Sequence, residues 1–189
     1  MHLLNNSVII TLISTITFPF ALQAEELEIT SSNIFIAGST NVGNWDCMQT
    51  SAEGHLNMNG DAIEHLLVKM PVEEFDNCDA PSIGPNSGQR DAVHNYLEAE
   101  DHPIITFDLN RTQPENIGDH AQFFGDLTVA GVTNEIREDV EIERNDDQIV
   151  VKGSTELKMT DFDIDPPSGL WGAIQARDEV EVEYEFTFE

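Results

Sequence analysis

The sequence predicts an all-β protein of about eight antiparallel strands, closed into a barrel or folded into a sandwich, with one α-helix. Apolar and polar residues alternate on both sides of a short break at residues 130–133, within the stretch 123–142. Residues 179–188 alternate in the same way, with glutamates between valines and aromatic residues. A period of two around a glycine-containing break indicates an antiparallel hairpin with one dry and one solvated face. Helical spacing is convincing only at residues 89–100.

The first predicted strands follow from the same alternation. It covers residues 27–39, 50–59 and 62–72, and an Asn-Gly pair between the last two is a strong turn signal. The run at residues 38–47 is rich in Gly, Ser and Asn, so it is predicted to be a loop, with Trp45 folded back onto the core.

The middle of the chain has a different character. Residues 75–88 contain Pro and Gly without periodicity, which predicts a long loop. The helix predicted at about 89–100 ends before Pro103, because proline disfavours helical conformation in the residue that precedes it. Its apolar face carries residues spaced three or four apart: Ala92, Val93, Tyr96 and Leu97.

Strands resume after the helix and continue to the C-terminus. We expect a strand at 104–109, a polar loop at 111–119 and the hairpin at 123–142. A turn at 145–147, a strand at 148–159 and a proline-containing loop at 166–169 follow. The alternating strand at the C-terminus closes the sheet. No repeat and no low-complexity linker interrupts this order, so residues 25–189 are predicted to form one domain.

The N-terminus carries an export signal. Residues 8–20 are apolar but too few to span a bilayer, and they lead to Ala-Leu-Gln-Ala before the first acidic residues. Residues 1–24 are therefore predicted to be a signal peptide cut after Ala24, which places the mature protein in the periplasm or outside the cell. An uncleaved N-terminal anchor is the alternative.

The chain is strongly acidic, with 36 Asp and Glu against 8 Lys and Arg. Proteins that bind nucleic acid need a basic footprint, so that partner is excluded. Charge also opposes docking on anionic membrane, and no stable membrane insertion is expected. The acidic residues are read as a hydrated outer surface, which suits a saline habitat or a protein partner.

Two cysteines, Cys47 and Cys78, are predicted to form a disulfide, because an exported protein meets an oxidising compartment. Closing a loop of about 30 residues stabilises the fold by roughly 3–4 kcal/mol in the chain-entropy model. A metal site is the weaker reading, since neither cysteine has a second ligand at close spacing, and two free thiols are a further alternative.

No motif supports catalysis. Residues 161–165 begin like a calcium loop, but Pro166 and Gly172 stand where that loop needs a glycine and a bidentate glutamate. The histidines are isolated, and no nucleophile or phosphate-binding motif occurs. The sequence therefore predicts neither an enzyme nor a metal or other cofactor.

Three stretches in order resemble the YceI-like, polyisoprenoid-binding family of exported bacterial proteins. They are residues 38–45; residues 90–97 followed by 102–107; and residues 125–133 followed by Gly153, residues 159–162 and the closing strand. Together they cover most of residues 33–189. The chain departs from the family pattern at Asp163, where a Gly is frequent, and at Asn134, where a basic residue is frequent.

The resemblance implies a lipocalin-like, extended antiparallel β-barrel whose apolar interior holds a polyisoprenoid, an isoprenoid quinone or another long-chain fatty amphiphile. Gly125 and Gly153 would leave gaps inside it. A protein-partner module and an enzyme acting on such lipids are the competing functions, and the sequence leaves a homodimer open. The residues expected to contact the ligand are Phe107, Phe123, Gly125, Leu127, Val129, Gly153, Phe162, Trp171, Tyr184 and Phe186.

Overall fold

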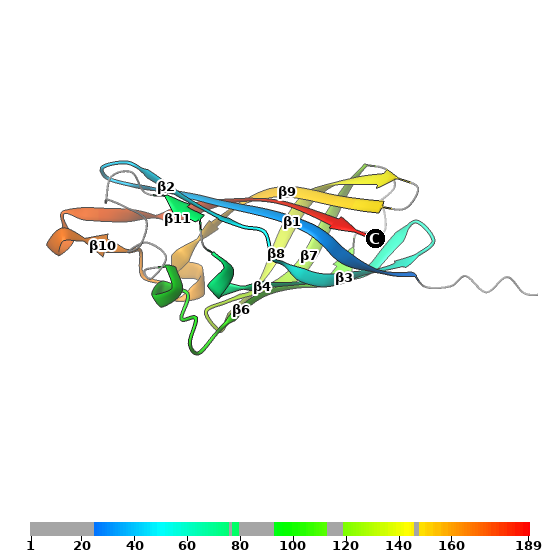
Figure 1. Ribbon diagram of the computed structural model, residues 1–189, viewed down its shortest axis with the longest axis horizontal. Helices are drawn as coiled ribbons and strands as arrows, with labels where there is room; N and C mark the ends of the chain where they lie inside the picture. The colour runs from blue at the N-terminus through cyan, green and yellow to red at the C-terminus, as the bar shows by residue number, and fades with distance from the viewer. Residues whose placement is uncertain (1–24, 76, 80–92, 113–118, 146–147) are drawn as a thin grey trace, which may run out of the picture.

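The computed structural model describes residues 25–75, 77–79, 93–112, 119–145 and 148–189 (Figure 1). The signal peptide predicted at residues 1–24 lies outside this range, as does most of the loop predicted at 75–88. The strands are β1 (Glu25–Thr40), β2 (Asn44–Gln49), β3 (Glu53–Asn59), β4 (Ala62–Pro71), β5 (Asn77–Asp79), β6 (Ile104–Thr112), β7 (His120–Val129), β8 (Val132–Asn145), β9 (Gln148–Lys158), β10 (Ser168–Gly169) and β11 (Ile174–Phe188). Three short 3₁₀ helices are η1 (Val72–Glu74), η2 (Met159–Phe162) and η3 (Leu170–Gly172).

The described strands close into an antiparallel barrel, which decides between the barrel and the sandwich that periodicity left open. Going round the wall, the order is β11, β9, β8, β7, β6, β4, β3 and β1, and β1 then pairs with β11. That closing pair places Ile34 opposite Tyr184. The barrel is elongated, with β10 near one end and the C-terminus toward the other (Figure 1). The prediction of a closed, extended all-β fold is confirmed.

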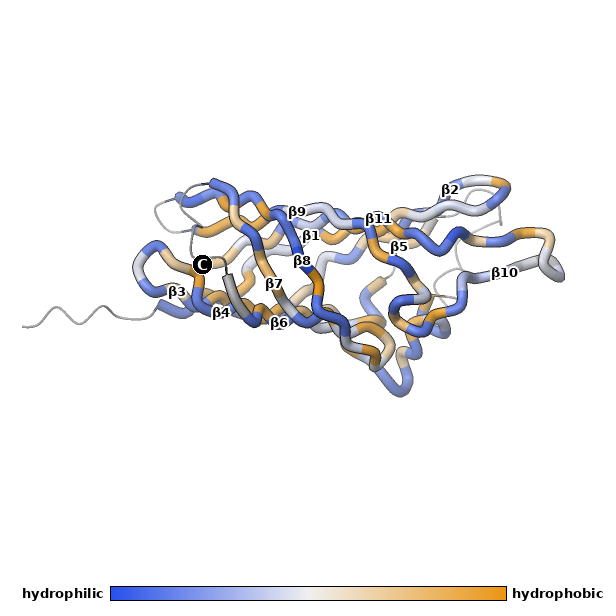
Figure 2. The backbone as a smooth tube through the Cα atoms, turned by 180° about the vertical axis from the view of Figure 1, so that it is seen from behind, coloured by the Kyte–Doolittle hydropathy of each residue, from blue (hydrophilic) through white to orange (hydrophobic). Residues whose placement is uncertain are grey.

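Inward and outward residues alternate along the strands as predicted, and hydrophobic and hydrophilic residues follow one another along the tube in Figure 2. In β7 each inward residue from Ala121 to Val129 is buried. The hairpin turns at Ala130 and Gly131, whose φ angles are +46° and +78°. A Cβ on Gly131 would also lie 2.5 Å from the His102 ring. Both the positive φ and this close contact therefore favour glycine at position 131.

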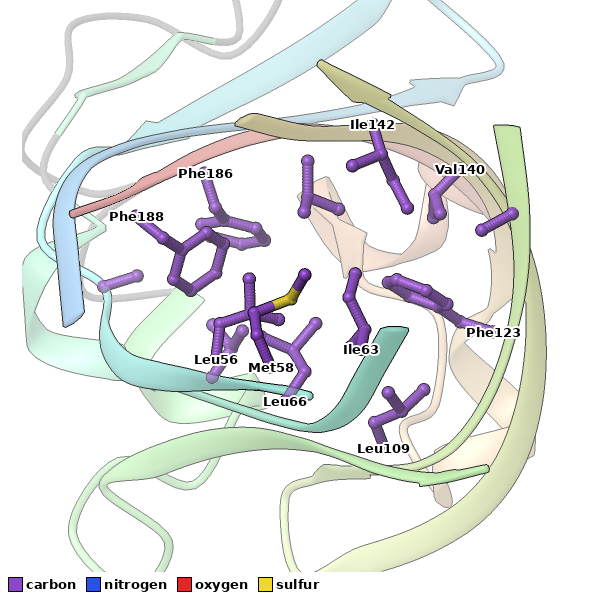
Figure 3. Close-up of a cluster of buried hydrophobic side chains, with 14 of the residues drawn as sticks. Leu56, Met58, Ile63, Leu66, Leu109, Phe123, Val140, Ile142, Phe186 and Phe188 are labelled. Carbon is purple, nitrogen blue, oxygen red and sulfur yellow. The ribbon is translucent and has the colours of Figure 1, made fainter. Parts of the chain in front are cut away.

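The barrel interior contains two clusters of buried side chains. The first cluster lies toward the C-terminal end, where Phe186 and Phe188 face Met58 and Ile63 (Figure 3). The second cluster includes Phe75, Ile105, Leu127, Val129 and Phe162.

The predicted disulfide joins Cys47 on β2 to Cys78 on β5, and the two residues lie directly opposite each other in that ladder. Both cysteines are buried in the second cluster. The bond spans 31 residues of chain, and loop closure of that length stabilises the fold by about 3–4 kcal/mol. It links β5 to β2, the strand that pairs with β1 beyond the point where β1 leaves β3.

Several predicted boundaries differ from the structure. The loop predicted at 38–47 is a hairpin: β1 runs to Thr40 and β2 begins at Asn44. Small polar residues there make the alternation too weak to identify a strand. Gly38 leaves room for the Trp45 indole, because a Cβ added at Gly38 would lie 2.2 Å from Trp45 Cζ2. Strand β5 occupies part of the loop predicted at 75–88, because pairing with β2 imposes extended backbone on a segment that has no periodicity.

The helix predicted at about 89–100 is helical over residues 93–96, and residues 97–101 form turns. Residues 89–92 lie outside the described range. Glu98 has a φ of +53°, which ends the helical conformation earlier than periodicity indicates. Val93 and Leu97 pack against the second cluster, so the apolar face of this segment covers that end of the barrel.

In the part of the chain that the structure describes, no helix has the length and apolar character needed to cross a membrane.

Candidate functional site

A narrow cavity of about 80 Å³ lies between the two clusters and takes its lining from both. Most of the lining is aliphatic or aromatic, and the polar groups are one carboxyl and two hydroxyls. The lining residues are Ile34, Leu66, Val68, Met70, Phe107, Phe123, Leu127, Ile136, Glu138, Val151, Thr155, Leu157, Val182, Tyr184 and Phe186.

Two inward-facing glycines shape the wall of this cavity. A Cβ on Gly125 would lie 2.5 Å from Cζ of Phe107, and a Cβ on Gly153 would lie 2.3 Å from the hydroxyl of Tyr184. Each glycine therefore admits an aromatic ring that crosses the strand from a neighbour. The gaps expected at these glycines are filled by the protein's own rings, which narrows the interior.

Glu138 is the charged residue of the lining. It occupies an inward position of β8 and is 4% exposed. Its Oε2 accepts a hydrogen bond of 3.4 Å from the Tyr184 hydroxyl. Its Oε1 is buried and has no hydrogen-bond partner among the described residues. One oxygen of this buried carboxyl thus lacks a hydrogen-bond partner among the described residues.

Burial controls the ionisation of this pair. Desolvation raises the pKa of the Glu138 carboxyl, an effect that the Thr155 and Tyr184 hydroxyls oppose and the neighbouring Asp139 charge reinforces. Desolvation likewise raises the pKa of the Tyr184 phenol, and the nearby Glu138 adds to that shift. Tyr184 therefore stays protonated and acts as a donor to the carboxyl.

The wall of the barrel is incomplete beside Glu138. The ladder between β8 and β9 runs from Asn145–Gln148 to Val140–Gly153 and goes no further within these two strands. Beyond that point β8 pairs with β7, and β9 pairs with β11. Further along, the Asn134 Nδ2 of β8 donates to the carbonyl of Asp161 in η2, which follows β9, at 2.6 Å. We call this unpaired stretch the seam.

Glu138 is not among the site residues predicted from the sequence, although its inward position follows from the sequence pattern. Within the alternating stretch 123–142, Glu138 lies two residues from Ile136 and from Val140, so the period of two places it on their inner face. Because many outward residues of this strand are also acidic, the residue type of Glu138 does not distinguish it from them. An acidic residue on the buried side of an alternating strand was the available signal.

The residues predicted to contact the ligand fall into several groups. Those that line the cavity are Phe107, Phe123, Leu127, Tyr184 and Phe186. Val129 and Phe162 are buried in the second cluster, and Gly125 and Gly153 lie beneath the rings described above. Trp171 is fully exposed in η3, at a φ of +55°, and is not part of the lining. The contact of any of them with a ligand stays a prediction.

Other titratable residues lie outside the cavity. His65 Nε2 is 2.9 Å from Asp108 Oδ1, but both side chains are substantially exposed. Among the described residues no group of three or more His, Cys, Asp or Glu is arranged to hold a metal ion. Asp163 adopts the left-handed conformation at φ +58°, so this turn forms without the glycine that the family pattern favours.

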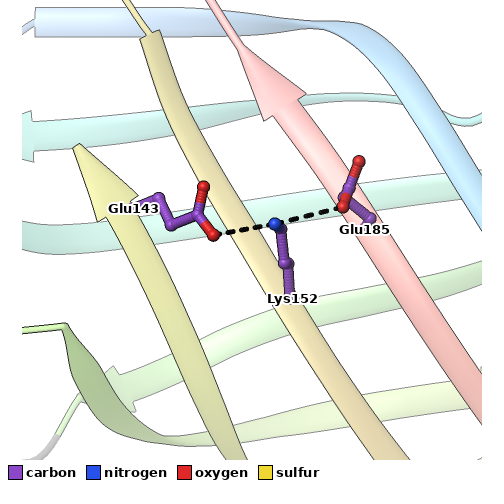
Figure 4. Close-up of polar contacts among 3 residues, drawn as sticks. All are labelled: Glu143, Lys152 and Glu185. Carbon is purple, nitrogen blue, oxygen red and sulfur yellow. Dashed lines mark hydrogen bonds and ion pairs between the residues drawn. The ribbon is translucent and has the colours of Figure 1, made fainter. Parts of the chain in front are cut away.

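The outer surface carries an open groove of about 1000 Å³ across β1, β7, β8, β9 and β11. Its lining combines Phe35 and Met48 with charged outward side chains. Lys152 lies there between Glu143 and Glu185, at 2.8 and 3.3 Å (Figure 4).

Comparison with known proteins is consistent with this architecture. A family model described as a YceI-like domain matches residues 26–188. Burkholderia cenocepacia BcnA has a similar structure, with a TM-score of 0.65 and 17% identity over 82% of this chain and 95% of that one. A Campylobacter jejuni YceI protein gives a TM-score of 0.55 and 18% identity over 80% of this chain and 84% of that one. No curated protein sequence matches the chain.

Proposed function

The chain belongs to the YceI-like domain family, and we propose that it is an exported, non-enzymatic carrier of a long-chain amphiphile. The ligand is a polyisoprenoid, an isoprenoid quinone or a similar fatty molecule, held in the apolar interior of the barrel. The buried disulfide supports export, because such bonds persist in oxidising compartments.

The observation that carries this proposal is the cavity between the two clusters. Ligand sites are concave and mostly apolar, with a few polar groups that fix orientation. The cavity meets the first condition, because its surface consists of apolar atoms, and the polar groups of Glu138, Thr155 and Tyr184 lie just behind that surface.

The cavity volume sets a condition on binding. Sites for small molecules usually measure about 300–1,000 Å³, several times the 80 Å³ enclosed here. A long tail therefore enters only if lining side chains move. The ring of Phe107 is the natural candidate, because it lies over Gly125 and occupies space that the missing side chain leaves.

The absence of an enzymatic role is part of the proposal. Catalysis on the ligand would need a base and an acid or nucleophile converging in the cavity. No histidine occurs among the described lining residues, and the His65–Asp108 pair is on the outer surface.

Extraction of the purified protein tests the proposal. The full chain is produced in its own host and isolated without detergent, and organic extracts are analysed by mass spectrometry. We expect one amphiphile in near-stoichiometric amount.

The test variant is Val182→Phe, which adds a larger side chain at the cavity wall on β11. We expect this variant to fold, as judged by circular dichroism, and to carry much less lipid. Equal lipid content in both proteins, or none in the native one, contradicts the carrier function.

A second function, a module that acts through a protein partner, is favoured by the outer groove. The groove is much larger than the inner cavity and presents Met48 at 42% exposure beside charged residues. Lipid-free native protein that retains a partner through this groove would support this alternative. Met48→Glu, a variant on the outer surface, would then abolish partner capture without changing the thermal midpoint.

A further inference from the structure

The polar residues of the cavity form one group across three adjacent strands. Glu138 lies on β8, Thr155 on β9 and Tyr184 on β11, and β9 stands between the other two. Gly153 makes the group possible, because its missing side chain lets the Tyr184 ring cross β9 and place its hydroxyl 3.4 Å from Glu138 Oε2. We call these three residues the polar site.

The polar site has an unused acceptor. Buried polar atoms in native proteins nearly always have a hydrogen-bond partner, so each exception calls for an explanation. Oε1 of Glu138 has none among the described residues, and the residue is 4% exposed, which keeps bulk water away. A donor supplied by a ligand would complete its hydrogen bonding.

We infer that Glu138, Thr155 and Tyr184 bind the uncharged hydroxyl head group of the amphiphile, an alcohol or a phenol. This inference rests on the proposed carrier function and names the chemical class of its ligand. The hydroxyl donates to Oε1 when the carboxyl is ionised, and it accepts from the carboxyl when that group is protonated. It is therefore complementary to Glu138 in both protonation states.

Anionic head groups are disfavoured at the same position. A phosphate or carboxylate beside Glu138 would place like charges a few ångströms apart in a poorly solvated interior, where charge repulsion is stronger than in water. No Lys or Arg belongs to the described lining, so no cation is available there to offset the repulsion. Asn134 stands where the family pattern often has a basic residue, and it contributes no charge.

The polar site lies beside the seam, where side chains alone close the wall of the barrel, since Glu138 is 4% exposed. Glu138 and Thr155 lie on facing strands just beyond the last β8–β9 pair, Val140–Gly153. The backbone ladder that would block lateral entry is missing at this level. The hydroxyl can thus lie at the seam while the tail follows the cavity between the clusters.

The ionisation of the polar site agrees with a neutral ligand. Desolvation raises the pKa of Glu138, and Tyr184 is the other titratable residue facing it from inside the barrel. Asp139, the next residue of β8, adds repulsion, whereas the facing residues on β7 and β9 are Phe123 and Thr155. The surroundings therefore oppose any second negative charge.

The test uses three probes that share one tail: geranylgeraniol, geranylgeranyl phosphate and geranylgeranylamine. Binding to the delipidated full chain is measured by calorimetry for the native protein, Glu138→Gln and Glu138→Leu. Glu141→Gln is the matched control, because Glu141 is an exposed residue on the outer face of the same strand.

The native protein and Glu141→Gln are expected to bind the alcohol at least about tenfold more tightly than the phosphate, because the phosphate would place a second negative charge beside Glu138. Glu138→Gln keeps a hydrogen-bonding group of the same size, so it retains alcohol binding while the preference over the phosphate largely disappears. Glu138→Leu weakens alcohol binding about ten- to hundredfold, because the charge-assisted hydrogen bond is lost.

The outcomes separate the two proposals. Binding of all three probes with equal affinity, tighter binding of the amine, or an unchanged preference in Glu138→Gln overturns the polar site and leaves the carrier function standing. Failure of the native protein and of Glu141→Gln to bind any probe overturns the carrier function and the polar site with it.

Discussion

The two halves of β8 lie in different surroundings, although one strand forms both. From Val140 to Asn145 the strand pairs with β9, and its inward residues Val140 and Ile142 are 2% and 1% exposed. From Val132 to Asp139 it forms no backbone ladder with the described residues of β9, and its inward positions hold the half-buried Val132, Asn134 and Ile136 and the buried Glu138. We call these the packed half and the seam half.

The difference shows where a barrel wall admits polar groups. In the packed half a complete ladder satisfies the backbone, and the inner face is free to pack hydrocarbon against hydrocarbon. In the seam half the ladder is interrupted, and the inner face carries a carboxyl that its neighbours satisfy only in part. We therefore expect stability to depend more on the packed half, and the proposed polar site lies in the seam half.

The largest effect is expected from Phe188→Ala on β11, which removes a ring from the first cluster, where the inward residues of the packed half are buried. Phe188 is fully buried in the first cluster (Figure 3). Its removal leaves a cavity and should lower the free energy of unfolding by about 3–5 kcal/mol, measured by urea denaturation. Thr187→Ala, on the opposite face of the same strand, is the control and should change it by about 0.5 kcal/mol or less. A loss below about 1 kcal/mol for Phe188→Ala would show that the packed half does not carry the stability.

A smaller, pH-dependent effect is expected in the seam half from Glu138→Gln. The pKa of Glu138 in the fold is raised above its ordinary value of 4.5, so ionisation disfavours folding. That penalty is full above the raised pKa and disappears as the pH falls below 4.5. Glu138→Gln should therefore be more stable than the native protein near pH 8, by on the order of 1 kcal/mol, with the difference closing near pH 4.

The measurement is urea denaturation of the two proteins across that pH range. Glu141→Gln reports the effect of losing one negative charge on the outer surface, and its difference from the native protein should not follow the same profile. A difference for Glu138→Gln that stays constant with pH would contradict the buried, partly satisfied state of this carboxyl.

The smallest effect is expected on the outer face of the packed half. Lys152 lies between Glu143 and Glu185 across adjacent strands (Figure 4), and these contacts raise its pKa. Because the group is exposed, Lys152→Gln should lower the thermal midpoint only slightly. The loss should vanish in about 1 M NaCl, where the Debye length is about 3 Å. A loss that persists in high salt would mean that the lysine stem contributes by packing.

The alternating pattern made most of the barrel predictable. On β7 and β11 the inward residues are the apolar ones that the period of two selects, because burial sorts side chains by polarity in any sheet with one dry face. The hairpin turn at Gly131 was predictable as well, because the turn needs a positive φ that glycine adopts readily. The β1–β2 hairpin was missed because Gly38 and its small polar neighbours pack against Trp45, a contact that no local pattern reports.

The candidate site was predictable only in its apolar part. Alternation placed Phe107, Phe123 and Leu127 on the inner face, and the structure brings them together in the cavity lining. Trp171 was also predicted to contact the ligand, but its side chain is fully exposed in η3, between β10 and β11. Its aromatic character gave no information on direction, because it lies in a short irregular segment with a left-handed backbone.

The sequence by itself determined which residues face inward, since a period of two is a local property and burial follows polarity. It also determined the acidic outer surface and, with two cysteines in the chain, the disulfide. Only the tertiary structure decided that β1 closes on β11, that two aromatic rings fill the spaces above two glycines, and that the β8–β9 ladder stops at Val140. These features depend on contacts between residues far apart in the chain, where loop closure and packing volume, and not local pattern, set the free energy.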